Sequence, residues 1–583
     1  MEPWETSFAA RKDLNQYNDN AIGLFALALK YGLDDLETVA ADSITDGAED
    51  KKCDIVYVNR DEEMAVVCQC YFSQKIKSEA PANKASDLNT AIGWLLQRPL
   101  EDLPDRIVSS AQELRSGINE GMIKTIHVWY VHNLPESKNV KQELLTVEST
   151  GSAAIANCFP EKKVVIHTLE VGQRTLGEWY SDTQSPILVN DDFDVDINNG
   201  FEISGPGWKA FVAAIPTRFL YRCYKKYKTK LFSANVRDYL GSRSSDSNIN
   251  NGIKKTAETD SVNFWVFNNG VTILVNNYDT EKSEKTKKLL KINGISIVNG
   301  AQTTGAIGSL SKLPSDKGFV QARFVQTENA ELIQDIIQYN NSQNKVTASD
   351  FRSTDNVQKR LKEQIAKIPD AEYEGGRRGG YGDAITRRPN LMPSYTVGQA
   401  LAAVHGDPVV AYNQKTKIWV EDKLYAKYFN EDTKGAHLVF TYGLLRAVEN
   451  RKLYLIERSK KSESSLTTAE EQQLNFFRRR GSTYLLVSAL AACIETFISR
   501  KIPNLFRISF GETISPKKSQ EIWSKIVEVN SPLSIHLDEA FSDGLKSAEK
   551  VKTAIQKFQS LVQVTMNANA QIYQEFAAQI AKS

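Results

Sequence analysis

The sequence is poor in the residues that build disulfides and structural metal sites. Its 583 residues include only six cysteines and six histidines, with no CxxC and no HExxH pattern among them. A disulfide framework needs a higher cysteine density, and a structural zinc site needs paired ligands at short spacing. We therefore expect neither, and so few cysteines fit a reducing compartment.

Long apolar runs are also missing. The best uncharged run near the C-terminus, from Gly481 to Ile494, has 14 residues, whereas a membrane-spanning helix needs about 20. The N-terminal stretch MEPWETSFAARKD has no apolar segment of the kind found in secretory signals. The sequence thus predicts a soluble, cytoplasmic protein without a membrane partner.

Neither sign of charge is in excess. Lys+Arg number 72 and Asp+Glu number 71, so the formal net charge is +1. This balance supplies no general field for a polyanion, so any contact with nucleic acid would be confined to a local groove or patch. The 41% of apolar and 25% of charged residues are those of an ordinary globular protein.

The local sequence pattern changes twice along the chain, which divides it into three regions. Strand-like and helix-like stretches alternate through about residue 180, which favours an α/β domain. Asn-Gly pairs, which favour tight turns, then become frequent, and helical spacing of apolar residues dominates after about residue 390. We predict a multidomain α/β protein with an N-terminal α/β domain (1–180), a central α+β core (181–390) and an all-α C-terminal region (391–583).

A β-hairpin is predicted near the N-terminus, where two β-prone runs flank the polar turn NRDEE. Asp54 and Gln69 would face each other across its strands, with Tyr71 on the same face as Gln69 and Asp46 just upstream. A carboxylate and an amide oxygen at this spacing can share Mg²⁺, which activates water and neutralises a phosphate. An ordinary hairpin with a solvated turn explains the same pattern without a site.

Asn-Gly pairs recur in two central motifs. FWVFNNGVTIL, residues 264–274, predicts two strands joined by the turn Asn268, Asn269 and Gly270. INGISIVNGAQTTGA, residues 292–306, predicts a strand that runs through a glycine turn into a helix start. Backbone N–H groups at that start would cradle a phosphate, although no Walker A lysine follows. The residues concerned are Asn299, Gly300, Gln302, Thr303 and Thr304.

Three further segments have polar or basic side chains that suit contact with nucleic acid or a nucleotide. YNNSQNKV contains Asn341, Gln343, Asn344 and Lys345, which suit base edges, sugars and phosphates, although asparagine at a helix end is also a common cap. EGGRRGGYG contains Arg377 and Arg378 in a glycine-rich loop that either clamps phosphates or is only a loop. A basic and aromatic run, residues 209–230, suits a backbone-binding groove or a solvated helix face.

Four segments taken in order resemble the AIPR family, the abortive-infection phage-resistance proteins of bacteria. They are LFSANVRDYLG, which contains Arg237, and then FWVFNNGVTIL, ISIVNGAQTTGAI and YNNSQNKV. The resemblance implies antiviral defence, a bacterial cytoplasm and action on DNA. VNGAQTTGA also resembles the DGQHR motif of ParB-like folds, which implies a nucleotide pocket, with Asn299, Thr303 and Thr304 in place of the Asp, His and Arg of that motif.

The N-terminal hairpin resembles the PD-(D/E)xK nucleases, in the restriction-endonuclease-like variant where DGG…D is followed by QxK. The resemblance places Asp46, Asp54, Gln69 and Tyr71 at the catalytic positions, with Asp54 and Gln69 as ligands of Mg²⁺. Tyr71 stands where the family has a lysine that orients or activates the attacking water. Lys75 and Lys77 follow close by, and Asp19 is the nearest acid for the helix-borne position.

Three functions remain open at this point. The first is a Mg²⁺-dependent deoxyribonuclease whose AIPR core senses or grips nucleic acid or a nucleotide. In the second, Tyr71 marks a degenerate nuclease, and the chain is a binding switch. In the third, the helical C-terminal region recruits defence-system proteins or further copies of the chain as a scaffold.

Overall fold

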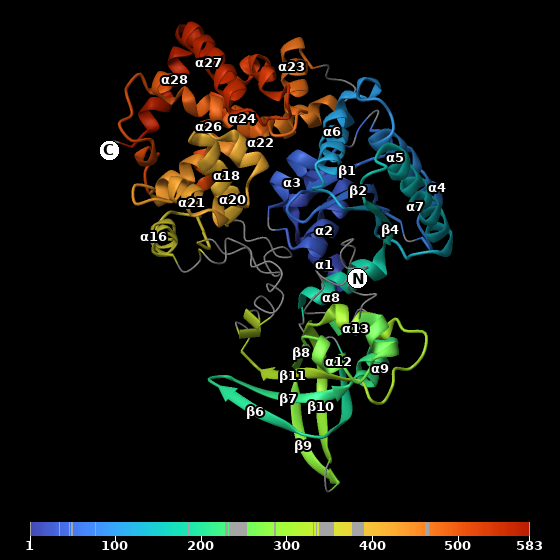
Figure 1. Ribbon diagram of the computed structural model, residues 1–583. Coiled ribbons are helices and arrows are strands. Elements are labelled where there is room, and N and C mark those ends of the chain that lie inside the picture. Colours follow the sequence, from blue (N-terminus) through green and yellow to red (C-terminus); the bar gives the residue numbers. More distant parts are fainter. Residues whose placement is uncertain are drawn as a thin grey trace.

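The computed structural model describes residues 2–33, 35–45, 47, 50–75, 77–184, 187, 189–227, 231–232, 253–284, 287–329, 332–333, 335–336, 352, 355–375, 390–460 and 466–581. Figure 1 shows an N-terminal α/β part, a central β-rich part and a C-terminal helical part. The prediction of a mixed α/β chain with a helical C-terminal region is therefore confirmed.

A four-stranded sheet forms the centre of the N-terminal part. It consists of β1 (Ile55–Asn59), β2 (Met64–Tyr71), β3 (Thr125–His132) and β4 (Val165–Val171), in that order. β1 and β2 are antiparallel and form the predicted hairpin, whereas β2, β3 and β4 run parallel. Parallel strands need both faces covered, which explains why β2 is apolar along most of its length.

Helices cover both faces of this sheet. On one face, Val66 and Cys68 of β2 belong to the core that includes side chains of α2. On the other face, Ala65 and Val67 belong to the core that includes side chains of α5, α6 and α7. The elements of the two layers are α1 (Pro3–Ala10), η1 (Lys12–Tyr17), α2 (Asn20–Tyr31), α3 (Leu36–Ser43) and α8 (Gln173–Gln184), and then α4 (Ala82–Ser86), α5 (Leu88–Leu96), η2 (Leu100–Asp102), α6 (Asp105–Asn119) and α7 (Lys138–Cys158).

The central part is a seven-stranded sheet in the order β5-β10-β8-β11-β7-β6, with β9 paired to β10. β8 and β11 are parallel, and the other pairs are antiparallel. The strands are β5 (Val189–Ile197), β6 (Gly200–Gly205), β7 (Trp208–Pro216), β8 (Val271–Val275), β9 (Asn277–Glu284), β10 (Lys287–Asn299) and β11 (Phe319–Thr327), and the helices are α9 (Thr217–Tyr227), α12 (Phe264–Phe267) and α13 (Ala301–Gly308).

The central part differs from one expectation and shows where two side chains of the basic run lie. The prediction that residues 264–267 form a strand is wrong, because they form α12, and only the residues after the Asn-Asn-Gly turn extend into β8. In the basic run, Arg218 and Lys225 of α9 donate hydrogen bonds to the backbone carbonyls of Pro314 and Leu310. These two side chains therefore hold neighbouring loops of the part itself.

The C-terminal part consists of helices around one large apolar core. α24, within the run from Gly481 to Ile494, is buried in this core from Ser482 to Ala491. Among the residues described here, no helix is long and apolar enough to cross a membrane. The helices are α16 (Asn356–Ile365), α18 (Ser394–Val404), α19 (Pro408–Asn413), α20 (Lys417–Val420), α21 (Asp422–Tyr428), α22 (Gly435–Lys460), α23 (Thr468–Phe477), α24 (Ser482–Ala492), α25 (Ile494–Ile498), η4 (Leu505–Arg507), α26 (Pro516–Asn530), η5 (Ser531–Phe541), α27 (Ala548–Thr565), η6 (Met566–Asn569) and α28 (Ala570–Gln579).

The N-terminal part packs directly on the helical part, and α3 contacts α22 (Figure 1). At this contact the guanidinium of Arg446 binds the carboxylates of Asp35 at 2.7 Å and Glu449 at 2.6 Å. Thr38 of α3 also donates a hydrogen bond to Glu449 at 2.8 Å. The buried ion cluster therefore ties the start of α3 to a helix more than 400 residues further along the chain.

Candidate functional site

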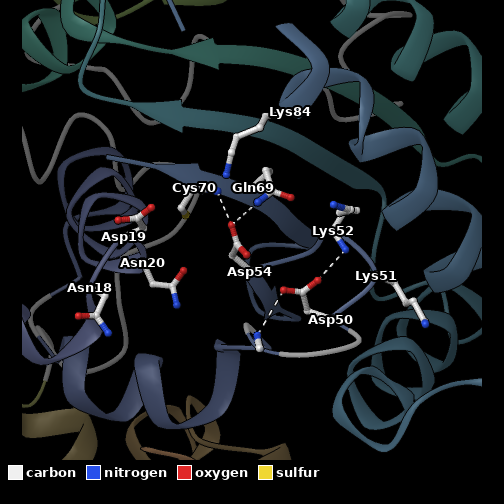
Figure 2. Close-up of a pocket in the computed structure, with 11 residues that line it drawn as sticks. Asn18, Asp19, Asn20, Asp50, Lys51, Lys52, Asp54, Gln69, Cys70 and Lys84 are labelled. Atoms are coloured by element: carbon white, nitrogen blue, oxygen red, sulfur yellow. Dashed lines mark hydrogen bonds between the residues drawn. The ribbon is translucent and has the colours of Figure 1, made fainter. Parts of the chain in front are cut away.

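A cavity of about 670 Å³ opens where β1 begins and β2 ends. Figure 2 shows its walls, which combine the residues before α2, the turn before β1, the end of β2 and the short helix α4. The cavity is lined by Asn18, Asp19, Asn20, Gly47, Asp50, Lys51, Lys52, Asp54, Gln69, Cys70 and Lys84. Acids, amides and lysines therefore meet at one edge of the N-terminal sheet.

Asp54 and Gln69 face each other at the floor of this cavity, as the hairpin register predicts. Ile55 pairs with Cys68, which brings Asp54 opposite Gln69. The Nε2 atom of Gln69 donates a hydrogen bond of 2.6 Å to Oδ2 of Asp54, and the backbone N–H of Cys70 donates another of 2.6 Å to the same oxygen. Two donors thus hold a carboxylate that is only 6% exposed.

The amide oxygen of Gln69 has no such support. Gln69 is 7% exposed, and its Oε1 atom is buried without a hydrogen-bond partner within the described chain. A buried polar atom without a partner costs about 1–3 kcal/mol, and a hydrogen-bond donor or a cation in the cavity would satisfy this oxygen. A hard cation, or water bound to it, is suited to this oxygen and to the adjacent carboxylate.

Two other acids line the cavity in different ways. Asp19 is exposed and lies at the N-terminal end of α2, so the acid expected on a preceding helix shares the cavity with Asp54. The carboxylate of Asp50 accepts hydrogen bonds from the backbone N–H groups of Lys52 and Gly47 at 2.8 and 3.3 Å. Asp50 therefore shapes the turn that leads into β1, whereas Asp19 is turned towards solvent.

Tyr71 stands beside two lysines. The Nζ atom of Lys77 donates a 2.8 Å hydrogen bond to the Tyr71 hydroxyl, and this bond, together with one involving Ser73, lowers the pKa of Tyr71 below its usual value. The Nζ atoms of Lys77 and Lys84 lie 5.5 and 5.1 Å from the centre of the Tyr71 ring. Lys84 lines the cavity, whereas Lys77 does not contribute to its walls.

The donor set fits a hard divalent cation rather than a structural zinc ion. Among the residues that the structure describes, no group of three or more His, Cys, Asp or Glu side chains gathers as a metal site. Asp54 and Gln69 offer oxygen ligands, and Mg²⁺ is commonly held by one or two carboxylates and otherwise by water and phosphate oxygens. Asp46, the remaining predicted acid, lies outside the described residues.

The two central Asn-Gly motifs come together in the second sheet. Asn268 donates a 3.1 Å hydrogen bond to the hydroxyl of Thr303, and the N–H of Gly270 bonds to the Asn268 side chain at 2.9 Å. β10 ends at Asn299, Gly300 caps α13 with φ of 91°, and α13 begins at Ala301, as predicted. The hydroxyl of Thr304 is fully buried and has no hydrogen-bond partner in the described part of the chain.

The remaining predicted residues are placed less fully. Asn269 is exposed, and Gln302 and Asn299 are half-buried near the same turn. Several residues lie outside the described part of the chain, so the contacts expected of them stay predictions. They are Arg237, Asn341, Gln343, Asn344, Lys345, Arg377 and Arg378.

Residues 232–570 match the family model described as AIPR protein, and this match covers more than half of the chain. The chain belongs to the AIPR family. Membership is consistent with a role in abortive-infection defence against phage. A search of curated proteins and a search of solved structures found no match. The AIPR match begins after the N-terminal sheet, so the cavity around Asp54 lies in a segment that the match does not cover.

Sequence reasoning missed part of the cavity wall. Lys51 and Lys52 follow Asp50 directly and are close in sequence to Asp54, so their position was accessible from the hairpin pattern. Lys84 comes from α4, well after the hairpin, and only the packing of that helix brings it to the cavity. No spacing rule marks such a residue in advance.

Proposed function

We propose that the N-terminal part of this AIPR protein hydrolyses phosphodiester bonds in DNA as part of phage defence. The observation that carries the proposal is the pair at the cavity floor, a held carboxylate of Asp54 beside the unpartnered amide oxygen of Gln69. The resemblance to PD-(D/E)xK nucleases at Asp46, Asp54 and Gln69 supports the same chemistry, and Tyr71 is the position that departs from the family.

Mg²⁺ would be held by Asp54 and Gln69, where it would neutralise the scissile phosphate and make bound water more acidic. The cavity volume of about 670 Å³ lies in the range of ordinary ligand sites, about 300–1,000 Å³. Asp54 is kept in place by the N–H groups of Gln69 and Cys70, so little ordering of this side chain is required when substrate binds.

The reaction is a hydrolysis in which the oxygen of water forms a bond to phosphorus. The bond between phosphorus and the leaving sugar oxygen breaks, one proton of the water passes to solvent, and the leaving oxygen takes a proton from solvent. Negative charge accumulates on the phosphoryl oxygens on the way, and fixed positive charge around the cavity lowers that barrier. The lysines that line the cavity are Lys51, Lys52 and Lys84.

Cleavage of plasmid and phage DNA with added Mg²⁺ tests the proposal. Asp54→Asn keeps the shape of the side chain but removes its charge, so we expect cutting to fall by about 100-fold or more. Glu161→Gln, an exposed change before β4, is the control and should cut like the unchanged chain. Equal cutting by Asp54→Asn and the unchanged chain would remove the assigned site. No cutting by the unchanged chain would favour the degenerate switch.

A second proposal concerns the AIPR core, which we infer binds a nucleotide or nucleic acid at the paired Asn-Gly motifs. Its support is the contact between Asn268 and Thr303 at the start of α13, with the unpartnered Thr304 hydroxyl beside it. Calorimetry with nucleotides and oligonucleotides, comparing the unchanged chain with Asn299→Ala, tests this. Binding that is absent in both, or equal in both, would contradict the assignment.

A further inference from the structure

We propose that Lys84 supplies, from α4, the positive charge that PD-(D/E)xK nucleases carry at the position of Tyr71, and that Tyr71 positions it. This inference rests on the proposed nuclease function and names a further residue of the same site. In the linear motif the cation is missing, since Tyr71 follows Gln69 where a lysine is expected. In the folded chain a lysine occupies the same cavity from a different element.

The position of Lys84 supports this role. Its side chain is half-buried, lines the cavity together with Asp54 and Gln69, and in Figure 2 extends from α4 towards these two residues. A phosphate bound to a cation at Asp54 and Gln69 would lie in this cavity. A lysine in the cavity wall would face that phosphate. Its ammonium therefore faces the same cavity as Asp54 and Gln69 (Figure 2) without being part of the strand motif.

The other lysines around the cavity are engaged elsewhere. Lys52 pairs with Asp87 at 3.5 Å, Lys51 lies over the ring of Trp94, and Lys77 donates to the Tyr71 hydroxyl. Within the described residues, no hydrogen bond or ion pair engages the ammonium of Lys84, which lies 5.1 Å from the centre of the Tyr71 ring. Lys51 likewise has only a ring contact, but with Trp94, so Lys84 is the cavity lysine that lies against Tyr71 with its donors available to a phosphate.

Tyr71 explains how a flexible lysine is held in position. A lysine side chain loses rotamer freedom when it is ordered, and the attraction of its cation to an aromatic face offsets part of that cost. The ring of Tyr71 offers that face to Lys84, while Lys77 holds the far end of the ring through its hydroxyl. Tyr71 is therefore a positioning residue.

During hydrolysis, the ammonium of Lys84 acts as a hydrogen-bond donor. It donates hydrogen bonds to the attacking water or to a phosphoryl oxygen, where negative charge grows as the bond to water forms and the bond to the leaving oxygen breaks. Removing one preorganised donor of this kind costs about 10²–10³ in rate. A matched cation placed at residue 71 would make the same contact from the strand.

Four variants of the full chain test the assignment by cleavage of plasmid DNA with Mg²⁺. We expect Lys84→Ala to lose about 100-fold in rate, and Lys84→Ala combined with Tyr71→Lys to recover most of it. Tyr71→Leu removes the ring face over which Lys84 lies but adds no cation, so we expect a loss of rate smaller than that of Lys84→Ala. Lys163→Ala, an exposed change just before β4 at the opposite edge of the sheet, should leave the rate unchanged.

A second measurement needs no cutting. Affinity for a short DNA duplex, measured in EDTA at several salt concentrations, should fall in Lys84→Ala, with a log-log salt slope smaller by about 0.9. Lys163→Ala should retain both values. A structural role alone would shift the thermal midpoint of Lys84→Ala without changing the slope, and that result would overturn the assignment.

The outcomes separate this inference from the proposed function. Full cutting by Lys84→Ala, with Asp54→Asn inactive, would overturn the role of Lys84 and leave the nuclease site standing. Equal cutting by Asp54→Asn and the unchanged chain would overturn the nuclease site itself. If the unchanged chain cuts no DNA, the proposed function fails, and an unaltered salt slope in Lys84→Ala would then overturn the phosphate contact of Lys84 as well.

Discussion

The amide of Gln69 donates a 2.6 Å hydrogen bond to the carboxylate of Asp54, across the hairpin formed by β1 and β2. The bond leaves the other end of the same amide, Oε1, buried without a partner in the described structure. One side chain therefore supports the carboxylate and offers an oxygen to the cavity. This pair is the most direct physical sign of a function for the N-terminal part.

The pair predicts a specific response to Gln69→Glu. Two buried carboxylates would then face each other, and like charges at this distance oppose ionisation of both. We expect a lower thermal midpoint than that of the unchanged chain in EDTA, and a larger rise in the midpoint when Mg²⁺ is added, because a cation between the carboxylates removes the repulsion. Differential scanning fluorimetry with and without Mg²⁺ measures both effects.

Gln97→Glu serves as the control, since Gln97 is exposed at the end of α5. It should shift neither the midpoint nor its response to Mg²⁺. A Mg²⁺-dependent rise no larger in Gln69→Glu than in the unchanged chain would count against a cation at this pair.

Gly300 predicts the cost of altering the turn between β10 and α13. Its φ is 91°, and a Cβ there would lie 2.4 Å from Cγ1 of Val271 and 3.0 Å from the carbonyl oxygen of Gly270. Gly300→Ala combines backbone strain with a clash, so we expect a loss of at least about 2 kcal/mol in the free energy of unfolding. Urea denaturation followed by fluorescence measures it.

Gly121→Ala separates the two causes. Gly121 also has a positive φ, 72°, but no atom lies within 4 Å of an added Cβ. Only the cost of a left-handed backbone conformation for a residue with a Cβ, about 1–2 kcal/mol, applies there. An equal loss of unfolding free energy in both variants would mean that the neighbours of Gly300 in the other Asn-Gly motif can move to accept the added Cβ.

The ion cluster at α3 and α22 predicts a large effect of Arg446→Met. The guanidinium is buried between Asp35 and Glu449, and its removal leaves two carboxylates without their cation. Breaking a buried pair in this way costs about 3–5 kcal/mol. We expect a lower urea midpoint and faster proteolysis between the N-terminal and helical parts.

Lys525→Met is the matched control for this prediction. Lys525 pairs with Glu575 at 2.9 Å, but both side chains are exposed, and exposed pairs contribute about 0–1 kcal/mol. A loss in Arg446→Met as small as that in Lys525→Met would show that the two parts are held together mainly by other contacts.

The same cluster predicts a pH dependence that arises from Glu449. Burial raises the pKa of Glu449 from 4.5 to about 7, with Arg446 acting in the opposite direction and Asp35 adding to the rise. The folded chain therefore holds a proton that the unfolded chain releases above about pH 4.5. Stability is lost as the pH rises from about 4.5 to about 7.

Glu449→Gln removes this titration, so its urea midpoint should change less than that of the unchanged chain between pH 5 and pH 8. Asp35 does not contribute in this window. Its pKa is lowered, because Arg446 and hydrogen bonds from Thr396 and Thr38 outweigh the burial that would raise it. Parallel pH profiles of the two chains would contradict the assignment to Glu449.

Local sequence patterns were sufficient to predict several elements of the structure. The hairpin and the facing of Asp54 and Gln69 follow from a short polar turn and the two-residue period of a strand. The passage from β10 through Gly300 into α13 follows from a strand pattern, a glycine turn and small helix residues. These features depend on neighbours in the sequence, and they were predicted correctly.

Longer-range features could not be predicted in this way. Residues 264–267 have the composition of a strand, yet they form α12, because strand formation depends on finding a partner strand as well as on local preference. The contact between Asp35 and Arg446 joins residues 411 positions apart. The local sequence pattern of neither segment predicts that the two residues are in contact.

The cavity contains residues that local sequence patterns predict and a residue that only tertiary packing brings to it. The amino-acid sequence by itself determined that a carboxylate and an amide meet on a hairpin, and that the strand position of the family lysine holds Tyr71. Only the tertiary structure decided that Lys84 lies over the Tyr71 ring in the same cavity. Strand pairing is a short-range property of the backbone, whereas the approach of α4 depends on how a whole helical layer packs against the sheet.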